Sequence, residues 1–231
     1  MRRSIGEFKS SIRHGYIAFY LLQDRDLAGR FKPIMTNALQ DQVHLTQAFS
    51  EDDLRQILAL QRANLPDHIS ASELQQEGFV TVKHDLLLLK SLNEPYPHII
   101  AKAGEEVIAY ALVMLSGKRD AVPVLVPMFE QIEKLTFAGN RLGAEDYLVM
   151  GQICIAKAYR GQGLFTALYT HMHACLGHQF SYVITEVSDR NKRSLKAHQK
   201  VGFQTLELYN DPFGERWHLL LWDWNKRSTK G

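Results

Sequence analysis

The amino-acid sequence predicts one α/β domain with a mixed β-sheet. Strand-like runs alternate with helix-like runs through the middle of the chain, and two β-rich runs near its end form a hairpin. Of the 231 residues, 45% are hydrophobic and 23% are charged, which is typical of a globular chain that buries one substantial core. This composition excludes disorder as the main state of the protein.

Two helices are expected in the first part of the domain. Ser50 and Asp53 form the capping-box pattern that begins the first helix, and Pro66 ends it. A second helical stretch starts from a cap at Ser70 or Ser72 and continues, with an interruption at Gly78, into the leucines of residues 86–89.

The rest of the domain is expected to alternate strands and helices around one long connection. Residues 116–146 contain two prolines and an amphipathic piece, so they form an insertion rather than a tight turn. This insertion either covers a binding site or packs in the core. The expected strands are residues 43–48, 98–103, 107–115, 147–155, 182–187, 203–209 and 217–224, and the later helices are residues 128–135, 163–176 and 191–201.

These elements place the domain over residues 43–226, between an N-terminal extension and a polar tail over residues 227–231. The extension, residues 1–42, lacks sustained apolar periodicity. Two interpretations of it stay open. Either translation starts at Met35 and the preceding residues are not native, or the extension is a helix that packs on the domain.

Charge and cysteine content narrow the class of protein. The chain has 27 basic and 25 acidic residues and a net charge of +2, so we expect no nucleic-acid partner. No apolar stretch approaches the roughly 18 residues that a membrane span needs, and acidic residues interrupt any N-terminal signal-like run. The two cysteines, Cys154 and Cys175, form no disulfide framework, which favours a reducing compartment. We therefore expect a cytoplasmic protein.

The segment "GQICIAKAYRGQGLFTALYTHM" places a strand, a glycine-containing turn and a helix in immediate succession. Gly161 and Gly163 let backbone N–H groups approach an anion, and the helix N-terminus adds unpaired donors and partial positive charge. Arg160 adds charge-assisted hydrogen bonds. The pattern predicts a pyrophosphate site, although many α/β folds use glycines at such a turn only to change direction. Neither G-x-x-x-x-G-K-[ST] nor G-x-G-x-x-G is present.

A second motif, "NKRSLKAHQKVGF", lies downstream and contains Asn191, Ser194 and His198. With it, the chain resembles the GNAT (GCN5-related N-acetyltransferase) superfamily over about residues 43–224, since residues 160–163 match its Q/R-x-x-G-x-G/A motif. The resemblance implies a mixed, centrally splayed sheet of about seven strands flanked by helices. The chain departs from the family pattern at Phe165, where Gly or Ala is usual, and at His198, where Tyr is frequent.

The resemblance also implies acetyl-CoA as co-substrate. Backbone groups of the strand before the loop would meet the pantetheine arm, and backbone N–H groups of residues 161–165 would hold the pyrophosphate. The implied cofactor-binding residues are Ile153, Ile155, Arg160, Gly161, Gln162, Gly163, Leu164, Phe165, Asn191 and Ser194.

The implied reaction is direct transfer of an acetyl or other short acyl group from acyl-CoA to a primary amine in a ternary complex. Our candidate acid is His198, because an imidazolium with a pKa of about 6.5 gives its proton readily to a thiolate of pKa about 8.5. Our candidate base is Glu186, at the end of a strand. Simpler roles stay open: His198 packs or bonds CoA, and Glu186 is solvated. Two alternatives to Glu186 are a water positioned by Gln152 and the carboxylate of Asp189.

Other functions are weighed against this one. A catalytically inactive CoA-binding regulatory module and a nucleotide- or phosphate-binding domain use the same loop. His171, Cys175 and His178 share a helix face and have the chemistry for zinc, but they flank a stripe that must be buried, so we expect no metal. Exposed strand edges allow a homodimer, although no sequence pattern indicates one. The amine acceptor is not identified by the sequence.

Overall fold

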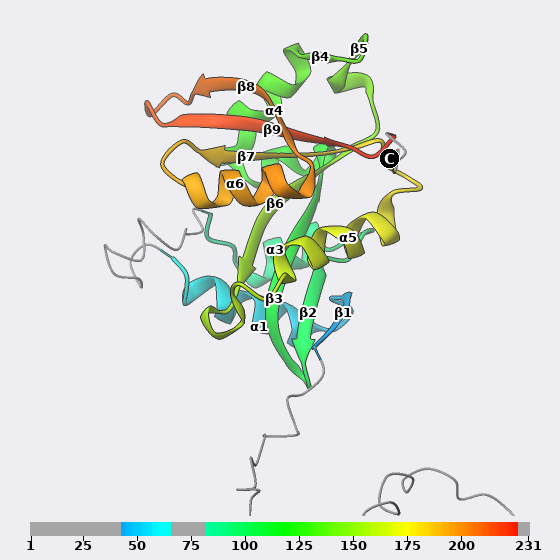
Figure 1. The fold of residues 1–231 in the computed structure, drawn as a ribbon, viewed down its shortest axis with the longest axis vertical. Helices are drawn as coiled ribbons and strands as arrows, with labels where there is room; N and C mark the ends of the chain where they lie inside the picture. The colour runs from blue at the N-terminus through cyan, green and yellow to red at the C-terminus, as the bar shows by residue number, and fades with distance from the viewer. Residues whose placement is uncertain (1–42, 66–81, 226–231) are drawn as a thin grey trace, which may run out of the picture. The chain divides into compact units, whose positions relative to one another are not determined.

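The computed structural model describes residues 43–65 and 82–225. Its main sheet has seven strands in the order β1-β2-β3-β6-β7-β9-β8 (Figure 1). Neighbouring strands are antiparallel, except that β6 and β7 run parallel. The sheet strands are β1 (Val43–Gln47), β2 (Ile99–Ala103), β3 (Glu106–Leu115), β6 (Tyr147–Ile155), β7 (Tyr182–Ser188), β8 (Gln204–Asn210) and β9 (Arg216–Asp223).

Helices cover both faces of this sheet. On one face lie α5 and α6, which are in front of the sheet in Figure 1, and on the other lie α1, α3 and α4. A core under α5 therefore faces two further cores on the opposite side of the strands. The helices are α1 (Glu51–Arg62), α3 (Leu86–Leu92), α4 (Val126–Lys134), α5 (Leu164–Leu176) and α6 (Lys192–Val201).

The sheet splays open between β6 and β7, as the resemblance implied. These strands pair only from Tyr147 opposite Tyr182 to Val149 opposite Ile184, after which they diverge (Figure 1). At the divergence, the Thr185 hydroxyl donates a hydrogen bond to the Met150 carbonyl at 2.8 Å. The register of β3 against β6 also shifts here, which marks a β-bulge next to Gln152. The predicted α/β fold with a centrally splayed seven-stranded sheet is confirmed.

The first predicted helix begins as its capping box indicates. Ser50 Oγ accepts from the Asp53 N–H, and Asp53 Oδ2 accepts from the Ser50 N–H, both at 3.0 Å. The prediction of one helical stretch running into residues 86–89 is wrong at its end, because residues 82–85 are not helical. Instead α3 starts anew, with Asp85 Oδ1 accepting from the Leu88 N–H at 2.8 Å. The predicted cap in residues 70–72 lies outside the described residues.

The insertion between β3 and β6 packs in the core. Its helix α4 buries Met128, Phe129 and Ile132 against the sheet. A small hairpin of β4 (Thr136–Phe137) and β5 (Asn140–Arg141), which the sequence pattern did not predict, follows α4. Across residues 43–65 and 82–225, no helix combines the length and the apolar character needed to cross a bilayer. The predicted extension over residues 1–42 and tail over residues 227–231 lie outside the described part of the chain.

Candidate active site

The glycine-containing turn lies between the end of β6 and the start of α5. Gly161 and Gly163 have φ values of +76° and +83°, in the left-handed region that side chains disfavour. Apart from the glycine itself and its two chain neighbours, no heavy atom of the described residues lies within 4 Å of the position that a Cβ would take at either glycine. The Ala167 N–H donates to the Gly163 carbonyl at 3.1 Å, which leaves the preceding N–H groups without an intrahelical acceptor. The turn therefore fits a phosphate group.

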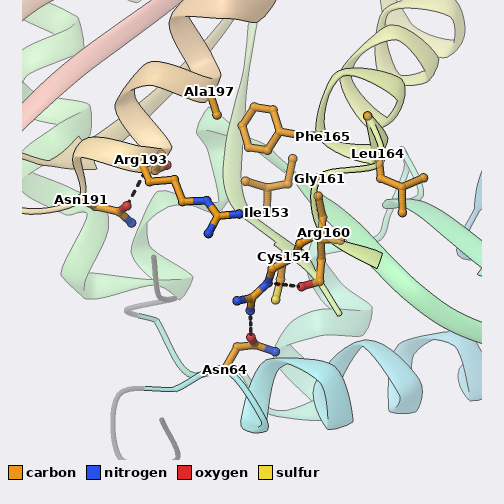
Figure 2. Close-up of a pocket in the computed structure, with 13 residues that line it drawn as sticks. Asn64, Ile153, Cys154, Arg160, Gly161, Leu164, Phe165, Asn191, Arg193 and Ala197 are labelled. Carbon is orange, nitrogen blue, oxygen red and sulfur yellow. Dashed lines mark hydrogen bonds between the residues drawn. The ribbon is translucent and has the colours of Figure 1, made fainter. Parts of the chain in front are cut away.

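A cleft of about 260 Å³ runs from this turn along β6 to the first turn of α6 (Figure 2). It brings together nine of the predicted cofactor-binding residues, and Gln162 is the exception. The Gln162 side chain is exposed and donates to the Ala158 carbonyl at 3.1 Å. The cleft is lined by Asn64, Ile153, Cys154, Ile155, Arg160, Gly161, Gly163, Leu164, Phe165, Asn191, Arg193, Ser194 and Ala197.

Arg160 is anchored to two other elements of the fold. Its Nε donates to the Ile155 carbonyl at 3.1 Å, and its guanidinium donates to Asn64 Oδ1 at 2.6 Å (Figure 2). Asn64 follows α1, and its own amide donates to the Leu60 carbonyl at 2.8 Å. Arg193 of α6 lines the same cleft. Two arginines thus line the cofactor-side cleft. Sequence reasoning missed Asn64 and Arg193, although Arg193 lies inside the second motif.

A smaller cleft opens at the splay. It shares Ile153, Asn191 and Ser194 with the first cleft, so the two are contiguous. Both catalytic candidates from the sequence line it, together with the middle of β6 and the end of β7. Its lining residues are Met150, Gly151, Gln152, Ile153, Thr185, Glu186, Val187, Ser188, Asn191, Ser194, His198 and Trp217.

Glu186 combines access to this cleft with a low-dielectric setting. Burial raises the pKa of its carboxyl group to about 7, although a hydrogen bond from Tyr209 acts in the opposite direction. The Tyr209 hydroxyl donates to Glu186 Oε2. A carboxyl group that titrates near neutral pH suits a proton acceptor in catalysis.

His198 is 1% exposed and lies among aromatic rings of Phe165, Tyr169 and Phe203. Burial lowers the pKa of its imidazole to about 4, so the ring is neutral at pH 7. Its Nδ1 lies 2.8 Å from the Ser194 carbonyl, which places the proton on Nδ1. Nε2 has no hydrogen-bond partner among the described residues. In this state the ring has no proton on Nε2 to donate.

The two alternatives for the base occupy different surroundings. Asp189 pairs with Lys192 at 2.5 Å and with His218 at 2.8 Å. Hydrogen bonds from these partners lower its pKa to about 2, so it stays ionised and is a weak base. Gln152 belongs to a buried hydrogen-bond network, which leaves little of its amide for positioning a water.

This network joins α1, the segment before α3, β3 and β6. Gln152 Oε1 accepts from Tyr110 Oη at 2.6 Å and from Gln61 Nε2 at 2.8 Å, and Gln152 Nε2 donates to the Val82 carbonyl at 2.8 Å. Gln61 also contacts His84, accepting from its backbone N–H at 2.9 Å. The network fixes the β6 bulge and explains why residues 82–85 are not helical. No periodic pattern in the sequence pointed to it.

Cys154 lines the cofactor-side cleft but is a poor nucleophile. Burial raises the pKa of its thiol to about 12, so the thiolate is scarce at neutral pH. Within residues 43–65 and 82–225, no three His, Cys, Asp or Glu side chains are grouped to hold a metal ion, including those on the α5 face.

Comparisons with known proteins agree with this fold. Among solved structures, this chain is similar to Arabidopsis thaliana NAA60 in complex with acetyl-CoA, with 11% identity, a TM-score of 0.55 and coverage of 78% of this chain and 99% of that one. The NatC complex bound to Gag peptide and CoA gives 10% identity, a TM-score of 0.54 and coverage of 78% and 98%. The ribosomal-protein-S18-alanine N-acetyltransferase of Escherichia coli gives 12% identity, a TM-score of 0.52 and coverage of 82% and 98%.

At these identities the solved structures establish the fold. A search of curated proteins returns no match. A sequence profile of the acetyltransferase (GNAT) family matches residues 55–203, a range that includes the glycine turn, β6, β7 and α6. The chain therefore belongs to the GNAT acetyltransferase family.

Proposed function

We propose that this protein is an N-acyltransferase that moves an acetyl or other short acyl group from acyl-CoA to a primary amine, by direct transfer in a ternary complex. One observation carries the proposal: a cleft with two arginines and a glycine turn meets, at the splay of the sheet, a second cleft that contains the partly buried carboxyl group of Glu186. The first suits a phosphorylated thioester, and the second suits an amine.

On the cofactor side, backbone groups of the turn and the α5 N-terminus would hold the pyrophosphate, with Arg160 and Arg193 adding positive charge. Ile153 and Ile155 lie on the β6 edge that β7 leaves unpaired, where backbone groups are available to the pantetheine arm. Asn191 and Ser194 would close the cleft from α6. The high pKa of the Cys154 thiol supports transfer without a covalent enzyme intermediate.

In the transfer, the amine nitrogen forms a bond to the acyl carbon as the carbon–sulfur bond breaks. Glu186 takes the proton that the amine loses, and the departing CoA thiolate gains one. A backbone N–H of β6 beside the splay would stabilise the negative charge that develops on the acyl oxygen, and such a donor is typically worth about 10²–10³ in rate.

Proton donation from His198 to the thiolate stays a prediction, and the surroundings of the ring set one condition for it. Nε2 must gain a proton during turnover, because the resting ring carries its proton on Nδ1. The same observation favours the second candidate function, an inactive module that binds CoA without transfer. The two functions agree on cofactor binding and differ in the release of free thiol.

The test is a thermal-shift comparison of acetyl-CoA, CoA and ATP, followed by a thiol-release screen over pooled primary amines that includes peptides, since one similar structure holds a peptide. A ligand at about 100 times its Kd adds about 2.7 kcal/mol of stability. Stabilisation by both CoA species with thiol release supports the enzyme. Stabilisation without release supports the inactive module, and stabilisation by ATP alone supports a nucleotide-binding domain. Cytoplasmic location, absence of a nucleic-acid partner and a homodimer stay predictions from the sequence.

A further inference from the structure

The hydroxyl group of Tyr209 touches the candidate base from two strands away. Glu186 lies on β7 opposite Leu219 of β9, and Tyr209 lies on β8 opposite Trp217 of β9. Because directly opposed residues point to the same face, both side chains lie on the face that α4 covers. The Tyr209 hydroxyl therefore reaches over β9 to donate to Glu186 Oε2.

We propose that Tyr209 is a positioning residue for Glu186: its hydroxyl holds Oε2, stabilises the ionised carboxylate and leaves Oε1 to take the proton from the acceptor amine. This inference rests on the proposed function.

Tyr209 is suited to remain a donor at every working pH. Burial, and next the negative charge of Glu186, raise the pKa of its phenol above the usual value. Glu186 Oε2 therefore always receives this hydrogen bond, and the rotation of the carboxylate is restricted. Oε1 has no hydrogen-bond partner within the described residues.

Several other charged or titratable groups lie around Glu186, and one of them, Asp211, acts against its ionisation. Asp211, in the turn between β8 and β9, raises the pKa of Glu186 by charge repulsion, and its own carboxylate accepts from Trp217 Nε1 at 3.1 Å. Across the cleft, His198 is neutral at pH 7. Glu207 lies on β8 opposite Leu219, on the same face. Asp189 pairs with Lys192 and His218, and the α4 charges Glu130, Glu133 and Lys134 are exposed.

Tyr209 and Asp211 thus bias Glu186 in opposite directions, and this makes a paired test. Tyr209→Phe removes the hydroxyl and keeps the ring, so the acidic limb of log kcat/KM against pH should move up by about one to two pH units. Asp211→Asn keeps an oxygen for the turn N–H groups but removes the charge and the acceptor of Trp217 Nε1, and the limb should move down by less than about one unit. Tyr182→Phe, on β7 and on the same face, is the matched control and should leave the limb in place.

The experiment uses acetyl-CoA and the most active primary amine from the thiol-release screen. The acceptor amine titrates identically in every assay, so a difference between the pH profiles of two variants comes from a group of the protein. At pH 7 Tyr209→Phe should be roughly ten-fold slower than the parent enzyme, and it should recover to within about two-fold at alkaline pH. A variant that merely folds poorly would be slower at every pH.

A second readout separates this proposal from the proposed function. Titration of the side-chain carboxyl carbons in ¹³C-glutamate-labelled protein reports the ionisation of Glu186 without turnover, with Glu186→Gln assigning the resonance. An upward shift in Tyr209→Phe together with a moved kinetic limb supports the proposal. An unshifted resonance, or a shifted resonance with an unmoved limb, overturns it. If the parent protein releases no thiol with any amine, the proposed function fails and the catalytic role of Tyr209 fails with it, while the titration still decides the hydrogen bond.

Discussion

Two buried tyrosines should respond in opposite ways to loss of their hydroxyl groups. Tyr110 and Tyr169 are both 0% exposed. The Tyr110 hydroxyl donates to Gln152 Oε1 at 2.6 Å, whereas the Tyr169 hydroxyl has no hydrogen-bond partner among the described residues. Replacing each by Phe keeps the ring and the packing. The difference between the two variants therefore isolates the hydrogen bond.

The expected magnitudes follow from these partners. In Tyr110→Phe, Gln152 Oε1 keeps its bond from Gln61, so no oxygen is orphaned and the free energy of unfolding falls by about 1 kcal/mol. In Tyr169→Phe an unsatisfied buried hydroxyl disappears, so the free energy of unfolding should stay unchanged or rise by up to about 1 kcal/mol. In Tyr110→Phe combined with Gln61→Leu, Gln152 Oε1 loses both donors, and the loss should exceed the sum of the single variants by about 1 kcal/mol or more.

The assay is urea unfolding followed by tryptophan fluorescence, with the parent protein and all four variants measured at pH 7.5. A change of 1 kcal/mol should also move Tm by about 2–4 °C for a domain of this size. Because the network fixes the bulge of β6 beside the splay, Tyr110→Phe should lower thiol release more than it weakens acetyl-CoA binding. Equal losses of stability in Tyr110→Phe and Tyr169→Phe, or strict additivity of the double variant, would refute the assigned network.

Three further predictions concern the base, the loop and the response to acid. Glu186→Gln should lower turnover by about 10²-fold or more with little change in acetyl-CoA affinity, and unchanged turnover across pH in stopped assays would remove it from the mechanism. Arg160→Met should weaken CoA binding by about ten-fold in calorimetry and also lower Tm, because the bonds to Asn64 and the Ile155 carbonyl are lost; a change in Tm alone would limit Arg160 to a structural role. Burial lowers the pKa of His98 to about 3. Between about pH 6.5 and pH 3 the unfolded state therefore binds a proton that the folded state does not, and the free energy of unfolding should decrease by up to about 1.4 kcal/mol for each unit by which the pH is lowered. His98→Asn, which keeps an acceptor for the Val113 N–H, should flatten this slope in urea titrations at pH 5–7, and an unaltered slope would contradict the assignment.

Local patterns in the sequence were sufficient to predict the strand, the turn and the helix that form the site. The run that predicted a strand over residues 147–155 is β6 with the same bounds, and the glycine turn lies where the motif put it. Such features depend on neighbours within a few residues, so they leave a readable period or motif. The same holds for α6, whose N-cap Asn191 accepts from the Ser194 N–H at 3.1 Å.

The support around the site was not predictable in this way. Arg160 and Asn64 are 96 residues apart in sequence, and Tyr209 is 23 residues from Glu186. A polar side chain whose partner is distant in sequence produces no periodic pattern, so it cannot be told from an exposed residue in the sequence. The misplaced end of the second helix has the same origin, because the His84 N–H and the Val82 carbonyl are engaged by Gln61 and Gln152 rather than by helix partners.

The splay belongs to a fold that is kept at 10–12% identity to the similar structures. Past Val149, β6 loses β7 as a partner, and its backbone groups on that side need other partners. The Thr185 hydroxyl supplies one for the Met150 carbonyl, and Arg160 supplies one for the Ile155 carbonyl. Ile153 lies in the segment between these two bonds, and it lines the cofactor-side cleft. The proposed recognition of the cofactor uses main-chain groups, which every residue type has, so it would let side chains along β6 vary as long as the bulge, the glycine turn and the divergence of the two strands are kept.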